Sequence, residues 1–318
     1  MKISLVTPAP RGTRYGNRVT ALRWAKLLRS LGHRVTVLTE FRDEHCDVLI
    51  ALHARRSADA MRQYKAAYPA LPLVLALTGT DVYQDIHFDS NAQRSLELAD
   101  RIVTLQPLAG DELPARLRHK VVSIIQSATT TPGGNSALPE TFDVCVVGHL
   151  RTVKDPFRAA MAARLLPAPS RIRVLQVGGA MTKGMEKRAL TEMARNPRYR
   201  WLGEMPHWRT RRTMKRSRVL VLSSKLEGGA NVVSEALADG VPVIGSRIPG
   251  NVGLLGEEYP GYYSPGDTRG LSRLLRRAET DPAYLNALRE RMARKAHVAS
   301  PEAERSNWAA LLNSLAPD

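Results

Sequence analysis

Short apolar runs alternate along this chain with stretches in which apolar residues recur at helical spacing. Trp24, Leu27, Leu28 and Leu31 have that spacing and predict one face of a helix. The apolar runs are nearly continuous, which is typical of strands buried on both faces of a parallel sheet. They occupy residues 3–6, 35–38, 47–53, 73–77, 101–105, 121–125, 142–147, 171–177, 218–222 and 241–245. The pattern predicts an α/β protein built on parallel sheets.

One stretch rich in proline, glycine and hydroxyl residues, 129–136, interrupts this alternation and predicts a linker. The 318 residues suffice for two α/β domains of ordinary size. We therefore assign residues 1–130 and 140–300 to two Rossmann-like domains. A last helix, 301–318, is expected to begin after Ser300 as its N-cap.

The most informative stretch follows the apolar run 218–222. It predicts a glycine turn and then a helix that starts near Asn231 and ends at Gly240. Backbone N–H groups at the start of such a helix bind anions well. Glu227 and Glu235 flank the turn, and a carboxylate one turn into the helix suits a diol such as a ribose. The alternative is a capped α/β unit with two solvated glutamates.

This stretch resembles the E-x7-E signature of retaining glycosyltransferases with the two-Rossmann-domain GT-B fold. Residues 146–156 resemble the V-G-x-L-x-x-x-K turn of the same family, which more often has arginine in place of His149. The resemblance implies two parallel sheets facing an interdomain cleft and a C-terminal helix that crosses back to the first domain. It also implies that Lys154 and Arg151 neutralise the leaving diphosphate, whose charge grows in the transition state, and that Glu227 contacts the sugar.

The resemblance further implies that the second domain binds a nucleotide sugar. The loop 248–253 would then face the donor sugar. No Asp-x-Asp motif appears, so we expect no metal, and no cofactor is expected besides the UDP-sugar as co-substrate. The donor-binding residues implied are Gly148, Gly203, Met205, Gly228, Gly229, Ala230, Asn231, Val232 and Glu235.

Polar residues of the first domain follow apolar runs, and open parallel sheets bind ligands beyond the carboxyl ends of their strands. The loop 7–17 is basic and glycine-containing, His53 ends an apolar run, and a turn leads to Asp81. The alternatives are a mobile basic loop, a structural histidine and an aspartate that caps the next helix. The candidate acceptor-binding residues are Arg11, Gly12, Arg14, Gly16, Asn17, Arg18, His53, Thr78, Gly79, Thr80 and Asp81.

Four segments, 6–21, 53–57, 77–83 and 148–156, together look similar to the selenosugar synthases (SenB) of bacterial selenoneine biosynthesis. This resemblance implies transfer of a sugar, expected to be N-acetylglucosamine, from a UDP-sugar to selenophosphate, with release of UDP and phosphate. The three arginines of the first segment would hold this small anion by bidentate hydrogen bonds. Selenium is already nucleophilic, so no strong general base is required.

The amino-acid composition of the chain favours some classes of binding partner and argues against others. The formal net charge is +17, with cations dense between residues 183 and 218, which favours anionic partners. Only 5% of residues are aromatic and no RNA-binding motif appears, so we expect no nucleic-acid partner. Cys46 and Cys145 lack metal-type spacing and indicate buried thiols of a reducing compartment. Because no membrane span or signal peptide is evident, we expect a cytoplasmic protein.

Other functions stay open at this point. A conventional glycosyltransferase would use the same donor site with a hydroxyl acceptor. A UDP-sugar epimerase of the same fold would need no acceptor. A basic nucleic-acid-binding module would bind with an affinity that falls steeply with salt and is indifferent to UDP.

Overall fold

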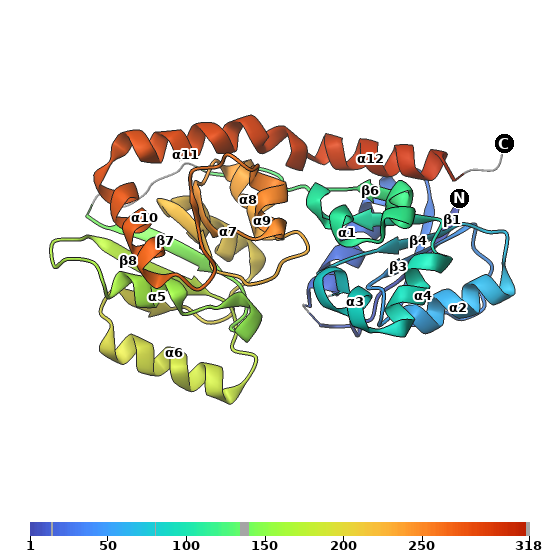
Figure 1. Ribbon diagram of the computed structural model, residues 1–318, viewed down its shortest axis with the longest axis horizontal. Helices are drawn as coiled ribbons and strands as arrows, with labels where there is room; N and C mark the ends of the chain where they lie inside the picture. The colour runs from blue at the N-terminus through green and yellow to red at the C-terminus, as the bar shows by residue number, and fades with distance from the viewer. Residues whose placement is uncertain (14, 80, 134–139, 316–318) are drawn as a thin grey trace. The chain divides into compact units, whose positions relative to one another are not determined.

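The computed structural model describes residues 1–13, 15–79, 81–133 and 140–315. The chain divides into two compact units (Figure 1). Unit 1 comprises Met1–Gln126 and Glu302–Asp318, and unit 2 comprises Ser127–Pro301. The strands of the described residues form one six-stranded parallel sheet in each unit.

The sheet of unit 1 has the strand order β2-β1-β3-β4-β5-β6. Its central strands are buried along their whole length, as their apolar runs predict. The strand order reverses between β1 and β3, which makes the carboxyl ends of these strands the switch point of this sheet. The bounds are β1 (Lys2–Val6), β2 (Arg34–Leu38), β3 (Val48–Leu52), β4 (Leu73–Ala76), β5 (Arg101–Thr104) and β6 (Val121–Ser123).

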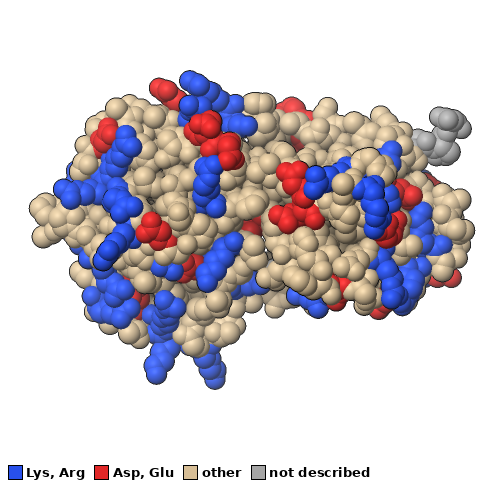
Figure 2. All heavy atoms as spheres, viewed as in Figure 1, with Lys and Arg blue, Asp and Glu red and all other residues tan. Residues whose placement is uncertain are grey.

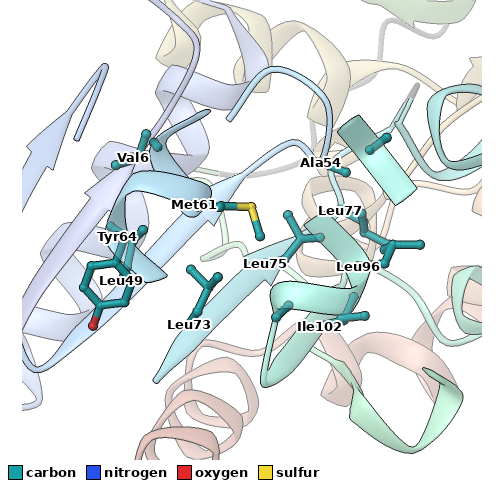
Figure 3. Close-up of a cluster of buried hydrophobic side chains, with 14 of the residues drawn as sticks. Val6, Leu49, Ala54, Met61, Tyr64, Leu73, Leu75, Leu77, Leu96 and Ile102 are labelled. Carbon is teal, nitrogen blue, oxygen red and sulfur yellow. The ribbon is translucent and has the colours of Figure 1, made fainter. Parts of the chain in front are cut away.

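Two layers of helices cover this sheet. On one face, Met61 and Tyr64 pack on leucines of β3 and β4 together with Leu96 (Figure 3). On the other face, Trp24, Trp308 and Leu311 share a core with β1 and β3. The helices are α1 (Gly16–Ser30), α2 (Ala58–Ala67), α3 (Ile86–Phe88), α4 (Ser90–Leu98) and α12 (Pro301–Asn313), with a π-helical segment at Asp81–Asp85 and 3-10 segments at Pro107–Glu112 and Ala115–Lys120.

The C-terminal helix α12 belongs to the core of unit 1, as the family resemblance implied. Trp308 is fully buried and meets Trp24 edge to face, with ring centroids 4.8 Å apart. Glu304 is also fully buried; it accepts hydrogen bonds from both terminal nitrogens of Arg23 (2.6 and 2.5 Å) and from the Trp24 indole nitrogen (3.0 Å). A buried carboxylate is stable only when it is paired in this way. Aromatic packing and a buried ion pair together attach α12 to α1.

The sheet of unit 2 has the strand order β12-β11-β10-β7-β8-β9. This is the order of a doubly wound Rossmann sheet, and it reverses between β7 and β10. The strands are β7 (Phe142–Val147), β8 (Ile172–Val177), β9 (Tyr199–Trp201), β10 (Val219–Leu222), β11 (Val243–Ser246) and β12 (Tyr262–Tyr263). The helices are α5 (Arg158–Ala163), α6 (Lys183–Arg195), α7 (His207–Arg216), α8 (Asn231–Asp239), α9 (Pro249–Leu255), α10 (Thr268–Thr280) and α11 (Pro282–Lys295), with short 3-10 turns at Thr152–Lys154 and Ala296–Ala299.

The first residues of the predicted linker are bound to helices of unit 2. The backbone nitrogen and the hydroxyl of Thr131 each donate to the Asp239 carboxylate at 2.7 Å. Arg211 donates to the same carboxylate at 2.8 Å and to the carbonyl oxygen of Thr129 at 2.9 Å. These bonds tie the start of the linker to α7 and α8.

Basic residues are spread widely over the surface. On the face shown in Figure 2, lysine and arginine side chains project from the region of α6, whose sequence contains three basic residues in its first six positions. Within the described residues, no helix is both long and apolar enough to cross a membrane.

Candidate functional site

A small cavity lies at the switch point of unit 2, beside the carboxyl ends of β7, β8 and β10. Open α/β sheets bind ligands at such points. Four of the predicted site residues line this cavity: Gly148, Lys154, Glu227 and Val232. The other lining residues are Val146, Val147, Pro156, Gln176, Val221, Leu222, Ser223 and Ser224.

Lys154 and Glu227 meet in this cavity although 73 residues separate them in the sequence. The Lys154 ammonium donates to Oε1 of Glu227, and the Ser224 hydroxyl donates to the same oxygen at 2.5 Å. The Lys154 side chain is 30% exposed and that of Glu227 only 12%. A cation and a carboxylate are therefore held together in the lining of the cavity. Both charged residues are predicted from the sequence, whereas Ser224 is not, although two hydroxyl residues follow the buried strand β10 and were a usable signal.

Backbone contacts fasten the segment that carries Lys154 to the turn after β10. The Ser223 hydroxyl donates to the carbonyl oxygens of Lys154 (3.0 Å) and Asp155 (2.9 Å). The backbone nitrogen of Lys225 donates to the carbonyl oxygen of Val153 at 2.8 Å. The position of Lys154 therefore depends on the turn after β10 as well as on β7, the strand that precedes the 3-10 turn Thr152–Lys154. Arg151 lies just before the 3-10 turn Thr152–Lys154, and its side chain is exposed.

The segment 248–253 is a helix and not the predicted loop. Helix α9 starts at Pro249, and proline suits a first helical position because that position needs no N–H donor. A Cβ atom on Gly250 would lie 2.0 Å from the carbonyl oxygen of Glu227. Only glycine allows this approach, so the start of α9 packs directly against the backbone of Glu227.

The glycine turn and the helix after it follow the prediction closely. Helix α8 begins at Asn231 and ends before Gly240, which has the left-handed φ of +64° that favours glycine. Ala230 occupies the N-cap position, and no side chain caps the helix there. Because alanine cannot accept a hydrogen bond, the start of α8 has no capping side chain to compete with a bound anion. Gly228, Gly229 and Val232 belong to the same turn and first helical residues.

Glycines also shape the opposite side of the cavity. A Cβ atom on Gly178, whose φ is +142°, would lie 2.1 Å from the carbonyl oxygen of Gly148. The Gly178 nitrogen donates to the carbonyl oxygen of Gly203 at 2.8 Å, and the Trp201 indole donates to the carbonyl oxygen of Gly178 at 2.8 Å. These bonds join the turn after β8 to β9 and the turn after it, and the close approach of Gly178 to Gly148 packs the turn after β7 against them. Met205, two residues after Gly203, is half-buried.

Glu235 has a partner that the sequence analysis did not predict. His207 is the first residue of α7, and its Nε2 lies 2.7 Å from Oε1 of Glu235. Glu235 is largely buried, whereas the side chain of His207 is 73% exposed. The hydrogen bond to Glu235 raises the pKa of His207 above its usual value, against the lowering effect of burial and of Arg211. No local sequence signal links these two positions.

We expect Glu235→Gln to lower the pKa of His207 toward its ordinary value, because the amide removes the negative charge that favours the imidazolium. The folded pKa of His207 is raised, so the pair stabilises the fold fully at pH values below the unfolded pKa of about 6.5. This stabilisation disappears as the pH rises through the folded pKa. An NMR titration of the His207 ring in both proteins measures the shift, with the exposed Glu186→Gln as the control. An unchanged titration in Glu235→Gln would contradict the pairing.

In unit 1, the side chains of His53 and Asp81 lie close together at the carboxyl end of β3. His53 is buried with a left-handed φ of +78°, and burial lowers its pKa, partly opposed by the charge of Asp81. Asp81 is fully buried and accepts from the backbone nitrogens of Ala54 (3.1 Å), Thr78 (3.0 Å) and Gly79 (2.8 Å). Its carboxylate therefore joins two strand ends and does not cap the next helix. Contact of these residues with an acceptor stays a prediction.

The basic loop after β1 contains the other predicted acceptor residues. Arg11 and Gly12 are exposed in a turn, and α1 begins at Gly16 with Asn17 and Arg18 in its first turn. Nη1 of Arg18 is buried and has no hydrogen-bond partner among the described residues. Arg14 and Thr80 lie outside the described residues.

Comparisons with known proteins identify a matching family and solved structures of similar fold. The family model described as "Glycosyl transferases group 1" matches residues 132–298. HepE of Anabaena, solved in complex with UDP, superposes with a TM-score of 0.79 at 16% identity and covers 99% of this chain and 100% of its own. No match was found among curated proteins.

Two further solved structures are similar along the chain. Sucrose-phosphate synthase from Thermosynechococcus elongatus has a TM-score of 0.77 at 18% identity, covering 99% of this chain and 98% of its own. An α,α-trehalose-phosphate synthase (UDP-forming) from Burkholderia vietnamiensis has a TM-score of 0.70 at 14% identity, covering 96% and 82%. At these identities the likeness shows a common fold. The predicted architecture of two Rossmann-like domains, the GT-B fold, is confirmed.

Proposed function

This chain belongs to the group 1 glycosyl transferases, and on that premise we propose that it transfers a sugar from a UDP-sugar to selenophosphate. The proposed donor is UDP-N-acetylglucosamine. Unit 2 binds the donor in this proposal, and residues of unit 1 bind the acceptor. The product would be a sugar with selenium on its anomeric carbon.

The observation that carries the donor assignment is the meeting of Lys154 and Glu227 beside the start of α8. A nucleoside diphosphate leaving a sugar gains negative charge, and a fixed cation with uncapped backbone N–H groups stabilises that charge. In the proposal Lys154 and Arg151 hold the diphosphate, and Glu227 accepts hydrogen bonds from the sugar hydroxyls. Glu235 binds the ribose once its hydrogen bond to His207 is released or shared.

The structural neighbours support uracil as the base of the donor. HepE was solved with UDP, and the trehalose-phosphate synthase is named as UDP-forming. In this chain Gly203 and Met205 belong to the joined turns after β8 and β9, where the proposal places the base.

The acceptor assignment rests on the four segments that resemble selenosugar synthases and on the arginines after β1. Nη1 of Arg18 is buried without a partner among the described residues, and a bound oxyanion would supply the missing hydrogen bond. The loops after β1 and β3 end at the switch point of the first sheet, which is where an α/β sheet binds a ligand. Arg11 and His53 belong to these two loops.

The proposed reaction has two steps: the first forms a carbon–selenium bond and breaks a carbon–oxygen bond, and the second forms a phosphorus–oxygen bond with water and breaks the phosphorus–selenium bond. Selenium attacks the anomeric carbon while the bond from that carbon to the oxygen of UDP breaks, and UDP leaves with the electron pair. Water then cleaves the phosphorus–selenium bond, giving phosphate and the selenosugar. Because selenophosphate is an anionic nucleophile, the first step requires no strong general base.

The decisive experiment incubates the purified protein with UDP-N-acetylglucosamine, with and without selenophosphate, and follows UDP release and product mass. We expect UDP release only with selenophosphate, together with a product that contains selenium and the sugar. UDP release with a hydroxyl acceptor and none with selenophosphate would favour a conventional glycosyltransferase. Conversion of the donor without any acceptor would favour an epimerase.

A further inference from the structure

In this structure the two charged groups assigned to the donor satisfy each other. The Lys154 ammonium donates a hydrogen bond to the Glu227 carboxylate. A diphosphate carries more negative charge than a carboxylate and would draw Lys154 away from Glu227. Glu227 would then lose its cation at the moment when it has to accept hydrogen bonds from the sugar. Something else has to keep this carboxylate in place.

The Ser224 hydroxyl is the other group that holds Glu227. Ser224 is 3% exposed, and its Oγ donates to Oε1 of Glu227 at 2.5 Å. This bond lies within a single turn of chain and does not depend on Lys154. A hydrogen bond to a charged group is worth roughly 10- to 100-fold in an equilibrium constant.

Two further buried residues fix the backbone of Ser224. The hydroxyl of Ser246, at the end of β11, donates to the carbonyl oxygen of Ser224 at 2.6 Å. Nδ2 of Asn251 in turn donates to the carbonyl oxygen of Ser246 at 2.8 Å. Both residues are fully buried, and next to Asn251 the close contact of Gly250 supports the backbone of Glu227. These contacts therefore fix the backbone position from which the Ser224 hydroxyl donates to Glu227.

We propose that Ser224 is a positioning residue that holds the Glu227 carboxylate for the sugar of the donor while Lys154 binds the diphosphate. This inference rests on the proposed donor site. It assigns different roles to the two residues. Lys154 contributes to the binding of UDP with or without an attached sugar, whereas Ser224 contributes only when the diphosphate carries a sugar. Ser246 and Asn251 set the position from which Ser224 donates.

With these roles, Ser224→Ala should impair turnover of the UDP-sugar and leave the affinity for UDP nearly unchanged. We expect kcat/KM for UDP-N-acetylglucosamine to fall about 10- to 100-fold, while the Kd of UDP changes less than about twofold. The matched control is Ser217→Ala. Ser217 is likewise 3% exposed, and its hydroxyl donates to the carbonyl oxygen of Thr213, away from the cavity. Both constants should stay near wild type in this control.

A double-mutant cycle with Glu227→Gln tests whether Ser224 acts through that carboxylate. The serine substitution should have little further effect in the Glu227→Gln background, because the group that it positions is already altered. Equal multiplicative losses in both backgrounds would overturn the proposal. It would also be overturned by a parallel loss of UDP affinity in Ser224→Ala, which indicates a general collapse of the cavity, or by unchanged kcat/KM.

Failure of the proposed acceptor is distinguishable from failure of this inference. If the wild type binds UDP but does not turn over with selenophosphate, the acceptor assignment alone fails. The ratio of the Kd values of UDP-N-acetylglucosamine and UDP then replaces kcat/KM. A ratio that rises in Ser224→Ala supports the positioning role, and a ratio that matches the wild type rejects it.

Discussion

Replacing Lys154 with alanine is expected to lower kcat/KM for the UDP-sugar by about 100- to 1,000-fold, which is the usual loss when one preorganised donor to a developing anion is removed. Lys154 lies at the switch-point cavity and its ammonium contacts Glu227. In the proposed reaction it turns to the leaving diphosphate, so its removal weakens the transition state more than the ground state. Steady-state kinetics with selenophosphate and the donor measures the change, and calorimetry measures the Kd of UDP.

The control for this prediction is Lys225→Ala. Lys225 has an exposed side chain in the turn after β10, and its link to the Lys154 segment is made by its backbone nitrogen. The substitution removes the same charge from the same region and leaves that backbone bond intact. It should change turnover by less than about threefold, as expected for an exposed charge whose interactions are screened. Normal turnover in both Lys154→Ala and Glu235→Ala would contradict the donor-site assignment.

Replacing Trp308 with alanine is expected to lower the free energy of unfolding of unit 1 by about 3–5 kcal/mol, the usual range for removing a large aromatic side chain from a core. The side chain is fully buried and packs edge to face on Trp24. Its loss leaves a cavity between α12 and α1, while the ion pair of Glu304 and Arg23 remains. Denaturant unfolding followed by circular dichroism measures the shift in midpoint.

Trp308→Phe separates packing from hydrogen bonding at this position. The indole nitrogen of Trp308 is buried without a hydrogen-bond partner among the described residues. Replacing this residue with phenylalanine therefore breaks no hydrogen bond. We expect this substitution to be clearly milder than alanine, because most of the ring volume is retained. Equal losses in the two variants would show that the indole nitrogen matters, and no loss in either would show that α12 is not needed for the core of unit 1.

Features that depend on neighbours along the chain could be predicted from the sequence. The apolar run, glycine turn and helical spacing between residues 218 and 245 became β10, α8 and β11, and Gly240 ends α8 in the left-handed conformation. Ser300 as an N-cap likewise predicted the start of the last helix, and α12 begins at Pro301. The exception is α9, where Pro249 was interpreted as part of a loop although proline is equally suited to the first turn of a helix.

The sequence by itself therefore determined the fold class, the position of most elements and which charged residues stand at strand ends, because periodicity, turn chemistry and helix signals are local. Only the tertiary structure decided which of these residues touch. Strand order β10-β7 brings Lys154 to Glu227, and the neighbouring β11 brings Ser246 to Ser224. The pairing of His207 with Glu235 depends in the same way on how α7 packs beside α8. Such contacts depend on strand order, register and helix packing, which bring distant positions together and leave no signal in the local pattern of either partner.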